Sequence, residues 1–171
     1  MISTVLGSCI SVCIRDKKKG IGGMNHFMLP QNNEFSSEAW GNNPVTSASR
    51  YGNWAMEYLI NAILKRGGEK KNFEVKVFGG GQMMAKMTDI GQKNIIFVYQ
   101  YLAEEALKIE ASDVGDIYAR KVLYFPDTGS VKVRRITNVK NDTIMRRETE
   151  YEKHVKVVDE SKPDANNIEL F

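Results

Sequence analysis

Cysteine and histidine are scarce in this chain of 171 residues, which contains two of each. Cys9 and Cys13 lie in one segment that alternates like a β-strand, so an extended backbone would hold their thiols too far apart for a disulfide between them. Two cysteines are also too few ligands for a zinc site by themselves, and one of the two histidines, His154, lies in a charged C-terminal segment. We therefore expect no metal site.

Long hydrophobic runs are missing as well, and so is an excess of charge of one sign. No segment approaches the ~20 apolar residues that a transmembrane helix needs, and the chain does not open with the hydrophobic segment of a secretory signal. The 24 Lys and Arg residues stand against 21 Asp and Glu residues, which leaves a net charge of +3. These absences predict a cytoplasmic protein that is not inserted in a membrane and does not bind nucleic acid.

The composition that remains is that of an ordinary globular domain. Hydrophobic residues make up 42% of the chain and charged residues 26%, and the length suits one domain with a buried core. Residues 1–136 are expected to form that domain. Residues 137–171 are dense in charge and then polar, so we expect a charged C-terminal extension that is partly disordered.

Hydrophobic spacing predicts strands interleaved with two main helices. The first helix should begin near Thr46 or Ser47, and the second should cover residues 92–107. Strands are expected at residues 73–77 and 108–111, and a hairpin at residues 121–135. Several strands joined as hairpins, with helices packed on them, indicate an α+β fold in which a mixed or antiparallel sheet forms part of a layered sandwich.

Three glycines, Gly79, Gly80 and Gly81, follow the strand predicted at residues 73–77. A glycine-rich turn can bind phosphate, but no Gly-Lys-Ser/Thr continuation is present and no strongly helical run follows directly. We therefore expect a tight turn or a close approach of two backbone segments.

The N-terminal segment holds the most informative pattern. Ile10, Val12 and Ile14 alternate with small residues, as in a half-buried strand whose apolar face points to a core. A polar turn with a glycine follows, and residues 21–29 are expected to return as the second strand of a hairpin.

The length of that turn decides which side chains meet across the hairpin. A loop of residues 16–19 pairs Cys9 directly with His26, which would place their Cβ atoms about 4.5–5.5 Å apart. A loop one residue longer pairs Cys9 with Phe27 instead. The first register is the one we predict.

A thiol beside an imidazole is the arrangement of a cysteine nucleophile and its base. The imidazole of His26 can accept the proton of the Cys9 thiol, hold the thiolate as an ion pair and later protonate a leaving amine. Gly7 and Ser8 allow a tight turn that can aim backbone N–H groups at a developing oxyanion. The alternative is a small buried cysteine and a structural histidine, which spacing alone leaves open.

Several separated segments carry a family resemblance in one order. They are residues 4–13 (TVLGSCISVC), 20–30 (GIGGMNHFMLP), 50–57 (RYGNWAME), 76–80 (KVFGG) and 120–133 (RKVLYFPDTGSVKV). Together they resemble the CheD family of chemoreceptor glutamine deamidases of bacterial chemotaxis. The resemblance covers the chain from its first residues to about Ile136.

The resemblance implies roles for particular residues. The family's nucleophile, in its Gly-Ser-Cys motif, falls on Cys9, and its base falls on His26. The third member is usually a threonine six residues before the cysteine; Ser3 occupies that position and Thr4 follows, so either hydroxyl can orient the imidazole. The resemblance further implies a layered α/β sandwich, similar to toxin glutamine deamidases, that needs no metal or organic cofactor.

The activity implied is hydrolysis of receptor glutamines to glutamate through a cysteine thioester. The implied substrate is the cytoplasmic domain of methyl-accepting chemoreceptors, and a CheC-type phosphatase is suggested as a regulatory partner. An alternative hypothesis is a catalytically weak adaptor that binds chemoreceptors or such a phosphatase, which Ser3 and a chain start close to the cysteine motif would favour. A small-molecule cysteine amidase is a third hypothesis.

Overall fold

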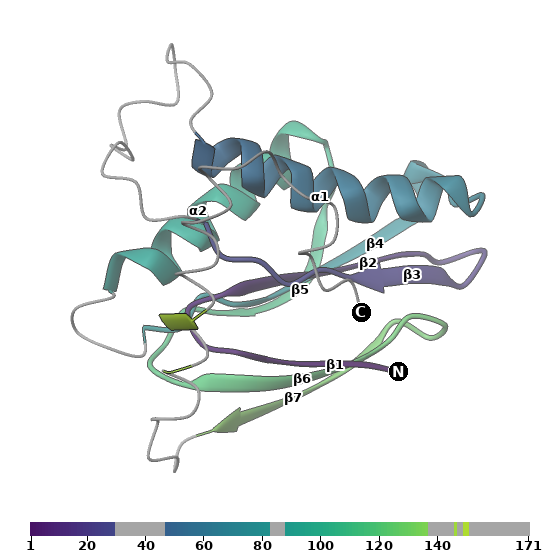
Figure 1. Ribbon diagram of the computed structural model, residues 1–171. Coiled ribbons are helices and arrows are strands. Elements are labelled where there is room, and N and C mark those ends of the chain that lie inside the picture. The colour runs from purple at the N-terminus through teal and green to yellow at the C-terminus, as the bar shows by residue number, and fades with distance from the viewer. Residues whose placement is uncertain (30–46, 83–87, 137–145, 147–148, 151–171) are drawn as a thin grey trace.

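Two sheets and two helices form three layers in the computed structural model, which describes residues 1–29, 47–82, 88–136, 146 and 149–150. The helices cover one face of a four-stranded sheet, and a three-stranded sheet lies against its other face (Figure 1). The elements are β1 (Ile2–Leu6), β2 (Ile10–Asp16), β3 (Ile21–Met24), α1 (Ser47–Lys65), the 3-10 turn η1 (Lys70–Asn72), β4 (Phe73–Gly79), α2 (Thr88–Glu104), β5 (Ile109–Val114), β6 (Ala119–Phe125) and β7 (Ser130–Ile136).

Strand pairing makes the larger sheet mixed and the smaller sheet antiparallel. The larger sheet has the order β3-β2-β4-β5, in which β4 and β5 run parallel and the other neighbours antiparallel. The smaller sheet has the order β1-β6-β7. The predicted α+β sandwich with two main helices is therefore confirmed. Strand β1 was not predicted from the sequence, and nearly all of residues 137–171 lies outside the described residues.

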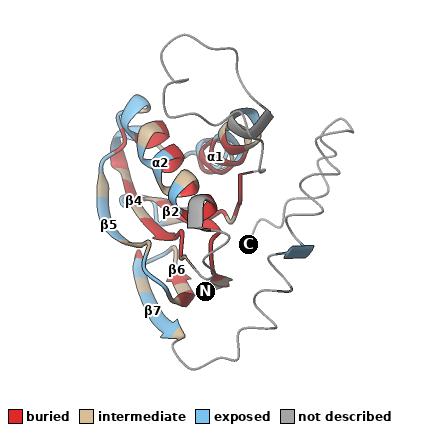
Figure 2. Cartoon of the chain, turned by 90° about the vertical axis from the view of Figure 1, so that its left-hand side faces the viewer, coloured by how far each residue is buried: buried red, intermediate tan, exposed pale blue. Residues whose placement is uncertain are grey.

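Strand β2 is buried on both faces and separates two hydrophobic clusters. Ile10, Val12 and Ile14 belong to the cluster under the helices, as their alternation predicts. Cys9 and Cys13 belong to the second cluster, which lies between the two sheets. Figure 2 shows burial concentrated where the layers face each other, whereas much of β5 and β7 is exposed.

Helix α1 begins and ends close to the predicted positions, whereas both ends of helix α2 are shifted. Helix α1 starts at Ser47, as expected, and the N–H of Gly68 closes its end on the carbonyl of Ile63. Helix α2 starts four residues earlier and ends three residues earlier than predicted. Ala106, with a φ of 53°, takes the left-handed position that usually marks a helix end with glycine, so composition gave no stop signal.

The predicted register of the first hairpin is wrong by two residues. Asp16 pairs with Ile21, and Ile10 pairs with Phe27, so Cys9 is not directly opposite His26. The reason is the side chain of Asp16, whose Oδ1 accepts the N–H groups of Lys18 and Lys19. Because these bonds belong to the turn, Asp16 closes the strand and the loop moves one residue along the chain.

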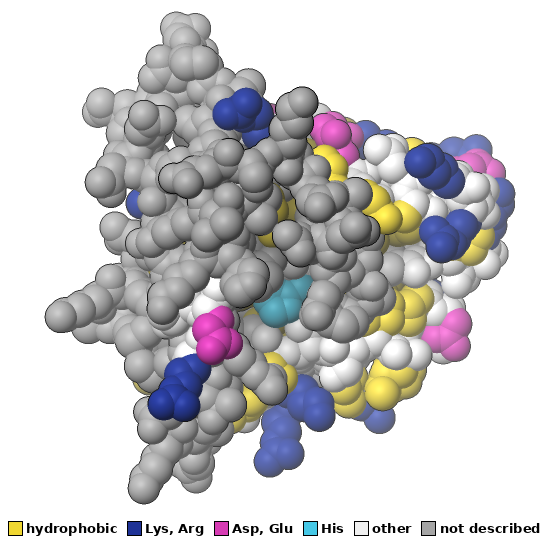
Figure 3. Space-filling model, in the orientation of Figure 1, with side chains coloured by type: hydrophobic (Ala, Val, Ile, Leu, Met, Phe, Trp, Pro, Cys, Tyr) yellow, Lys and Arg dark blue, Asp and Glu magenta, His cyan; other side chains and the backbone are white. Residues whose placement is uncertain are grey.

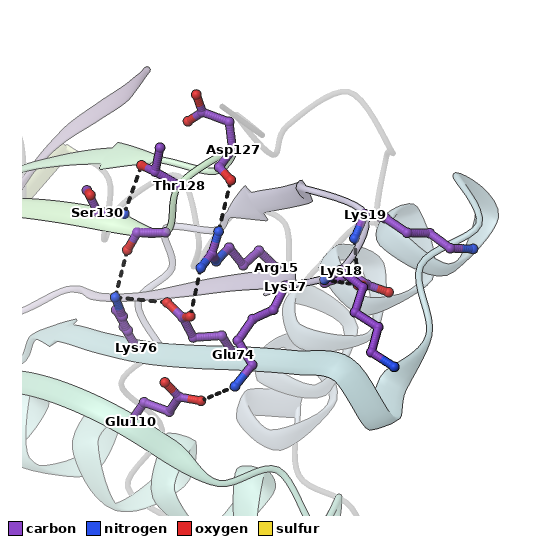
Figure 4. Close-up of polar contacts among 12 residues, drawn as sticks. Arg15, Lys17, Lys18, Lys19, Glu74, Lys76, Glu110, Asp127, Thr128 and Ser130 are labelled. Atoms are coloured by element: carbon purple, nitrogen blue, oxygen red, sulfur yellow. Dashed lines mark hydrogen bonds and ion pairs between the residues drawn. The ribbon is translucent and has the colours of Figure 1, made fainter.

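An ion-pair cluster ties the two sheets together at the end where β2 turns into β3 (Figure 4). Glu74 on β4 accepts from Arg15 at 3.0 Å and from Lys76 at 2.9 Å. The same two cations donate to backbone carbonyls in the turn between β6 and β7, Arg15 to Asp127 and Lys76 to Gly129. Burial alone would raise the pKa of Glu74, but the hydrogen bonds and charges of both cations outweigh it and lower that pKa.

Replacing Glu74 should weaken this connection. We expect Glu74→Gln to lower the free energy of unfolding by about 1–3 kcal/mol, because two partly buried cations lose the negative charge that they share and one of its two acceptor oxygens. Since the folded-state pKa of Glu74 lies below the unfolded value, its contribution is present above the unfolded pKa and is lost as pH falls through the folded pKa. Urea unfolding at several pH values measures both effects.

Glu110→Gln is the matched control, because it removes one partner of the more exposed pair between Lys17 and Glu110. Exposed pairs contribute about 0–1 kcal/mol, so this variant should unfold almost like the wild type. Equal losses in the two variants would contradict the role given to the Glu74 cluster.

Candidate active site

The chain passes from the smaller sheet to the larger one at Gly7-Ser8-Cys9, between β1 and β2. The carbonyl of Gly7 accepts from Gly81 N–H at 2.7 Å, and the carbonyl of Cys9 accepts from Gly80 N–H at 2.7 Å. A side chain at Gly79 would collide with the Cys9 carbonyl, and a Cβ at Gly81 would lie 2.9 Å from the Gly7 carbonyl oxygen. The close backbone approach predicted for the glycines is confirmed.

Those two hydrogen bonds also bear on the phosphate-binding alternative. The N–H groups of Gly80 and Gly81 point at backbone carbonyls of the cysteine segment. A phosphate cradle needs such N–H groups directed at the ligand. The three glycines instead serve to place the residues on either side of Ser8.

Asn25 positions the strand that carries His26. Its backbone N–H donates to the carbonyl of Val12 at 3.1 Å, while its side-chain Oδ1 accepts the N–H of Val12 at 2.8 Å. The carbonyl of Asn25 accepts from the hydroxyl of Ser11. The regular ladder bond from the Val12 N–H to the Asn25 carbonyl is therefore replaced at both ends by a bond to a side chain. This role was not predicted from the sequence, although an asparagine directly before the candidate histidine is visible there.

Cys9 and His26 face the same layer of the molecule. Met24 and Met28, which flank His26 at strand spacing, belong with Cys9 to the cluster between the sheets. In the observed register Cys9 and His26 are diagonal neighbours, an arrangement in which Cβ atoms lie about 7–8 Å apart or somewhat less. The two residues therefore share a face as diagonal neighbours and are not the directly opposed pair that was predicted.

Of the two candidate hydroxyls, Thr4 contacts the histidine. Its Oγ1 lies 2.8 Å from Nδ1 of His26, and its side chain is buried at the inner face of β1. Ser3 is exposed, because successive residues of a strand point to opposite faces. The smaller sheet thus supplies a polar partner to an imidazole carried by the larger sheet.

Burial sets the protonation of this site. It lowers the pKa of His26 to about 4, so the imidazole is neutral near pH 7. A neutral imidazole is the form that can accept a proton from a thiol. Burial raises the pKa of Cys13 despite the nearby Lys76, which keeps that second thiol protonated and unreactive.

The surroundings of the site add three observations. Within the described ranges, no three His, Cys, Asp or Glu side chains are grouped so that they could hold a metal ion. Neither described helix is long and apolar enough to cross a membrane. On the face seen in Figure 3, basic and acidic side chains of the described residues are spread out rather than gathered by sign.

Comparison with known families agrees with the motifs. The family model described as CheD chemotactic sensory transduction matches residues 28–135. The chain belongs to the CheD family. The matched region begins just after His26 and therefore does not include Cys9 or His26.

Individual CheD relatives align with essentially the whole chain. A protein of Methylobacillus flagellatus is 48% identical, over 100% of this chain and 81% of its own length. Relatives from Hydrogenovibrio crunogenus and Halorhodospira halophila are 45% and 44% identical, over 99% and 100% of this chain and 85% and 77% of their own lengths. All three are named probable chemoreceptor glutamine deamidase CheD.

The low pKa of His26 can be measured directly. We expect NMR titration of a His154→Asn variant, which leaves one histidine, to show His26 protonating near pH 4. The unfolded chain takes up this proton near pH 6.5, so the contribution of His26 to stability should be constant above that value and fall between pH 6.5 and 4.

A second variant separates His26 from other titrating groups. His26→Asn should lack this part of the pH dependence of unfolding, while the rest of the curve keeps its shape. A titration midpoint at or above the value for a free imidazole would contradict the desolvated site.

Proposed function

We propose that this chain is a protein-glutamine deamidase that converts glutamines of a chemoreceptor cytoplasmic domain to glutamate. The observation that carries the proposal is the 2.8 Å contact between Thr4 and His26, which fixes an imidazole on the same face as Cys9. The names of the CheD relatives support the substrate class. The reaction would take place in the cytoplasm, where such receptor domains lie.

The proposed reaction uses Cys9 as the nucleophile. Its Sγ attacks the carboxamide carbon while neutral His26 accepts the thiol proton, and a tetrahedral intermediate forms. His26 then gives the proton to the departing nitrogen, so ammonia leaves and a thioester remains. Water, deprotonated by His26, cleaves the thioester to release glutamate and restore the thiol.

Thr4 would act by holding the ring. A contact at Nδ1 fixes the imidazole plane, and in the proposed reaction Nε2 is the ring atom that accepts and returns the proton. Because this hydroxyl belongs to Thr4, the site does not depend on Ser3, whose presence was one argument for the adaptor hypothesis. The contact therefore supports the deamidase over the adaptor.

The product would change the receptor through its charge. Each turnover replaces a neutral amide with a carboxylate on a helical bundle, and like charges on packed helices repel. A CheC-type phosphatase is part of the same proposal as a regulatory partner. Its binding would have to leave the candidate site at Cys9 and His26 accessible for the substrate.

Intact-mass spectrometry of a purified receptor cytoplasmic fragment tests the activity. We expect the wild-type chain to raise the fragment's mass by replacement of amide NH2 with OH, and peptide mapping to assign the sites. Cys9→Ala and His26→Ala should each lower the rate by at least about 10³-fold, because they remove the nucleophile and its base. Cys13→Ala is the matched control and should retain the activity.

The outcome that would reverse this proposal is equally concrete. If the wild type binds several receptor fragments without any mass change, the adaptor hypothesis replaces the deamidase. A mass change that persists in Cys9→Ala would assign the chemistry to another residue.

Thr4 and Ser3 form a matched pair for the role of the hydroxyl. Thr4→Val should lower kcat about tenfold or more, because the imidazole loses its orienting contact. Ser3→Ala alters an exposed side chain and should stay within about twofold of the wild type. Steady-state kinetics on the receptor fragment measures both, and the reverse order of effects would make Ser3 the orienting residue.

A further inference from the structure

Asn94 is a buried amide on the apolar face of α2. Its neighbours at helical spacing are the buried hydrophobic residues Ile90, Val98 and Tyr101. Asn94 is polar and is also fully buried. Burying an amide without partners costs free energy that an apolar residue at the same place would not. The hydrogen bonds of the Asn94 side chain must therefore compensate for its burial, and their partners indicate its role.

The two ends of the Asn94 side chain bind the two strands of the candidate site. Nδ2 donates to the carbonyl of Ser8 at 2.8 Å, and Oδ1 accepts the N–H of Leu29 at 2.9 Å. Ser8 directly precedes Cys9, and Leu29 lies three residues after His26. One side chain thus joins the nucleophile's segment to the segment of the base.

The strand register shows what this amide replaces. Ile10 and Phe27 exchange both backbone hydrogen bonds, at 2.9 and 3.0 Å. In an antiparallel ladder the next hydrogen-bonded pair lies two residues further on each strand, which here is Ser8 with Leu29. The amide of Asn94 stands between the carbonyl and the N–H of that pair, so the strands separate by the width of an amide beside Cys9.

The backbone of α2 comes close enough for this short side chain to reach. A Cβ at Gly91, about one helical turn before Asn94, would lie 2.6 Å from the carbonyl oxygen of Gly80 and 2.9 Å from that of Gly81. Any larger residue there would push the helix away from the glycine segment. Gly91 and Asn94 therefore work together at one contact.

We propose that Asn94 is a positioning residue that wedges the two strands apart and fixes Cys9 relative to His26. The wedge also orients the peptide between Ser8 and Cys9: since the peptide is trans, holding the Ser8 carbonyl directs the Cys9 N–H to the opposite side. The inference rests on the proposed function, because it assigns Asn94 to the same cysteine and histidine.

Asn94→Ala and Asn94→Asp test the wedge. The aspartate keeps an acceptor for Leu29 but, when ionised, replaces the donor to Ser8 with a second acceptor, and it serves as the second variant if the alanine chain fails to fold. Asn72→Ala is the matched control, since Asn72 is also buried but bonds Asp16 at the other end of β2. The wild type and the three variants are each measured in the presence and in the absence of the receptor fragment.

With receptor fragment, we expect both Asn94 variants to lose about 10- to 100-fold in kcat with KM changed by less than about threefold, since orientation and not binding is lost. Without receptor, the rate of Cys9 alkylation by iodoacetamide near neutral pH should fall several-fold, and the NMR pKa of His26 should rise toward its ordinary value. Asn72→Ala should lose stability but leave kcat, alkylation and the His26 pKa as in the wild type.

The receptor-free measurements separate failure of this inference from failure of the proposed function. If folded Asn94 variants keep the wild-type kcat, alkylation rate and His26 pKa, the wedge has no positioning role. If the wild type does not deamidate but the Asn94 variants still alter Cys9 alkylation and the His26 pKa, the deamidase proposal fails while the positioning role of Asn94 stands.

Discussion

The structure depends on how the backbone of residues 7–9 crosses from one sheet to the other. A buried backbone must have its carbonyl groups hydrogen-bonded, and here the donors come from outside the crossing segment. Gly80 and Gly81 bind the carbonyls of Cys9 and Gly7, and Asn94 binds that of Ser8. The candidate nucleophile therefore sits on one of the most constrained segments of the described chain.

The glycine segment that supplies two of those donors is itself held by a buried arginine. Arg120 on β6 has no exposed surface and donates to the carbonyls of Gly79, Gly115 and Tyr118, while its Nε binds the carboxylate of Asp113 at 2.9 Å. These bonds join the ends of β4 and β5 in the larger sheet to β6 in the smaller sheet. Arg120 thus joins the two sheets at the end that carries the candidate site, and the Glu74 cluster joins them at the opposite end.

Much of the fold and part of the site could be predicted from the sequence, because the signals were local. Alternation in residues 10–14 gave the faces of β2 correctly, and Gly-Ser-Cys with Asn-His gave the candidate pair. The register error arose where a side chain replaced a backbone bond, because the turn bonds of Asp16 move the hairpin two residues off the predicted register. Asn94, a buried amide within an apolar helical face, was not singled out from the sequence. Choosing Thr4 over Ser3 required β1, whose inward face is defined only by its pairing with β6.

The low pKa of His26 changes the resting state expected for a cysteine and histidine pair. The sequence predicted a thiolate held by an imidazolium, but a ring whose pKa is lowered to about 4 by partial burial is neutral near pH 7. In the proposed reaction, the thiol proton then moves as Sγ attacks, and the positive charge on the ring exists only while negative charge develops on the substrate. Such a pair is less exposed to oxidants than a permanent thiolate, and its rate depends on how exactly the two groups are held. That dependence is a physical reason for a buried asparagine to occupy a position where an apolar residue would have stabilised the helix contact at lower cost.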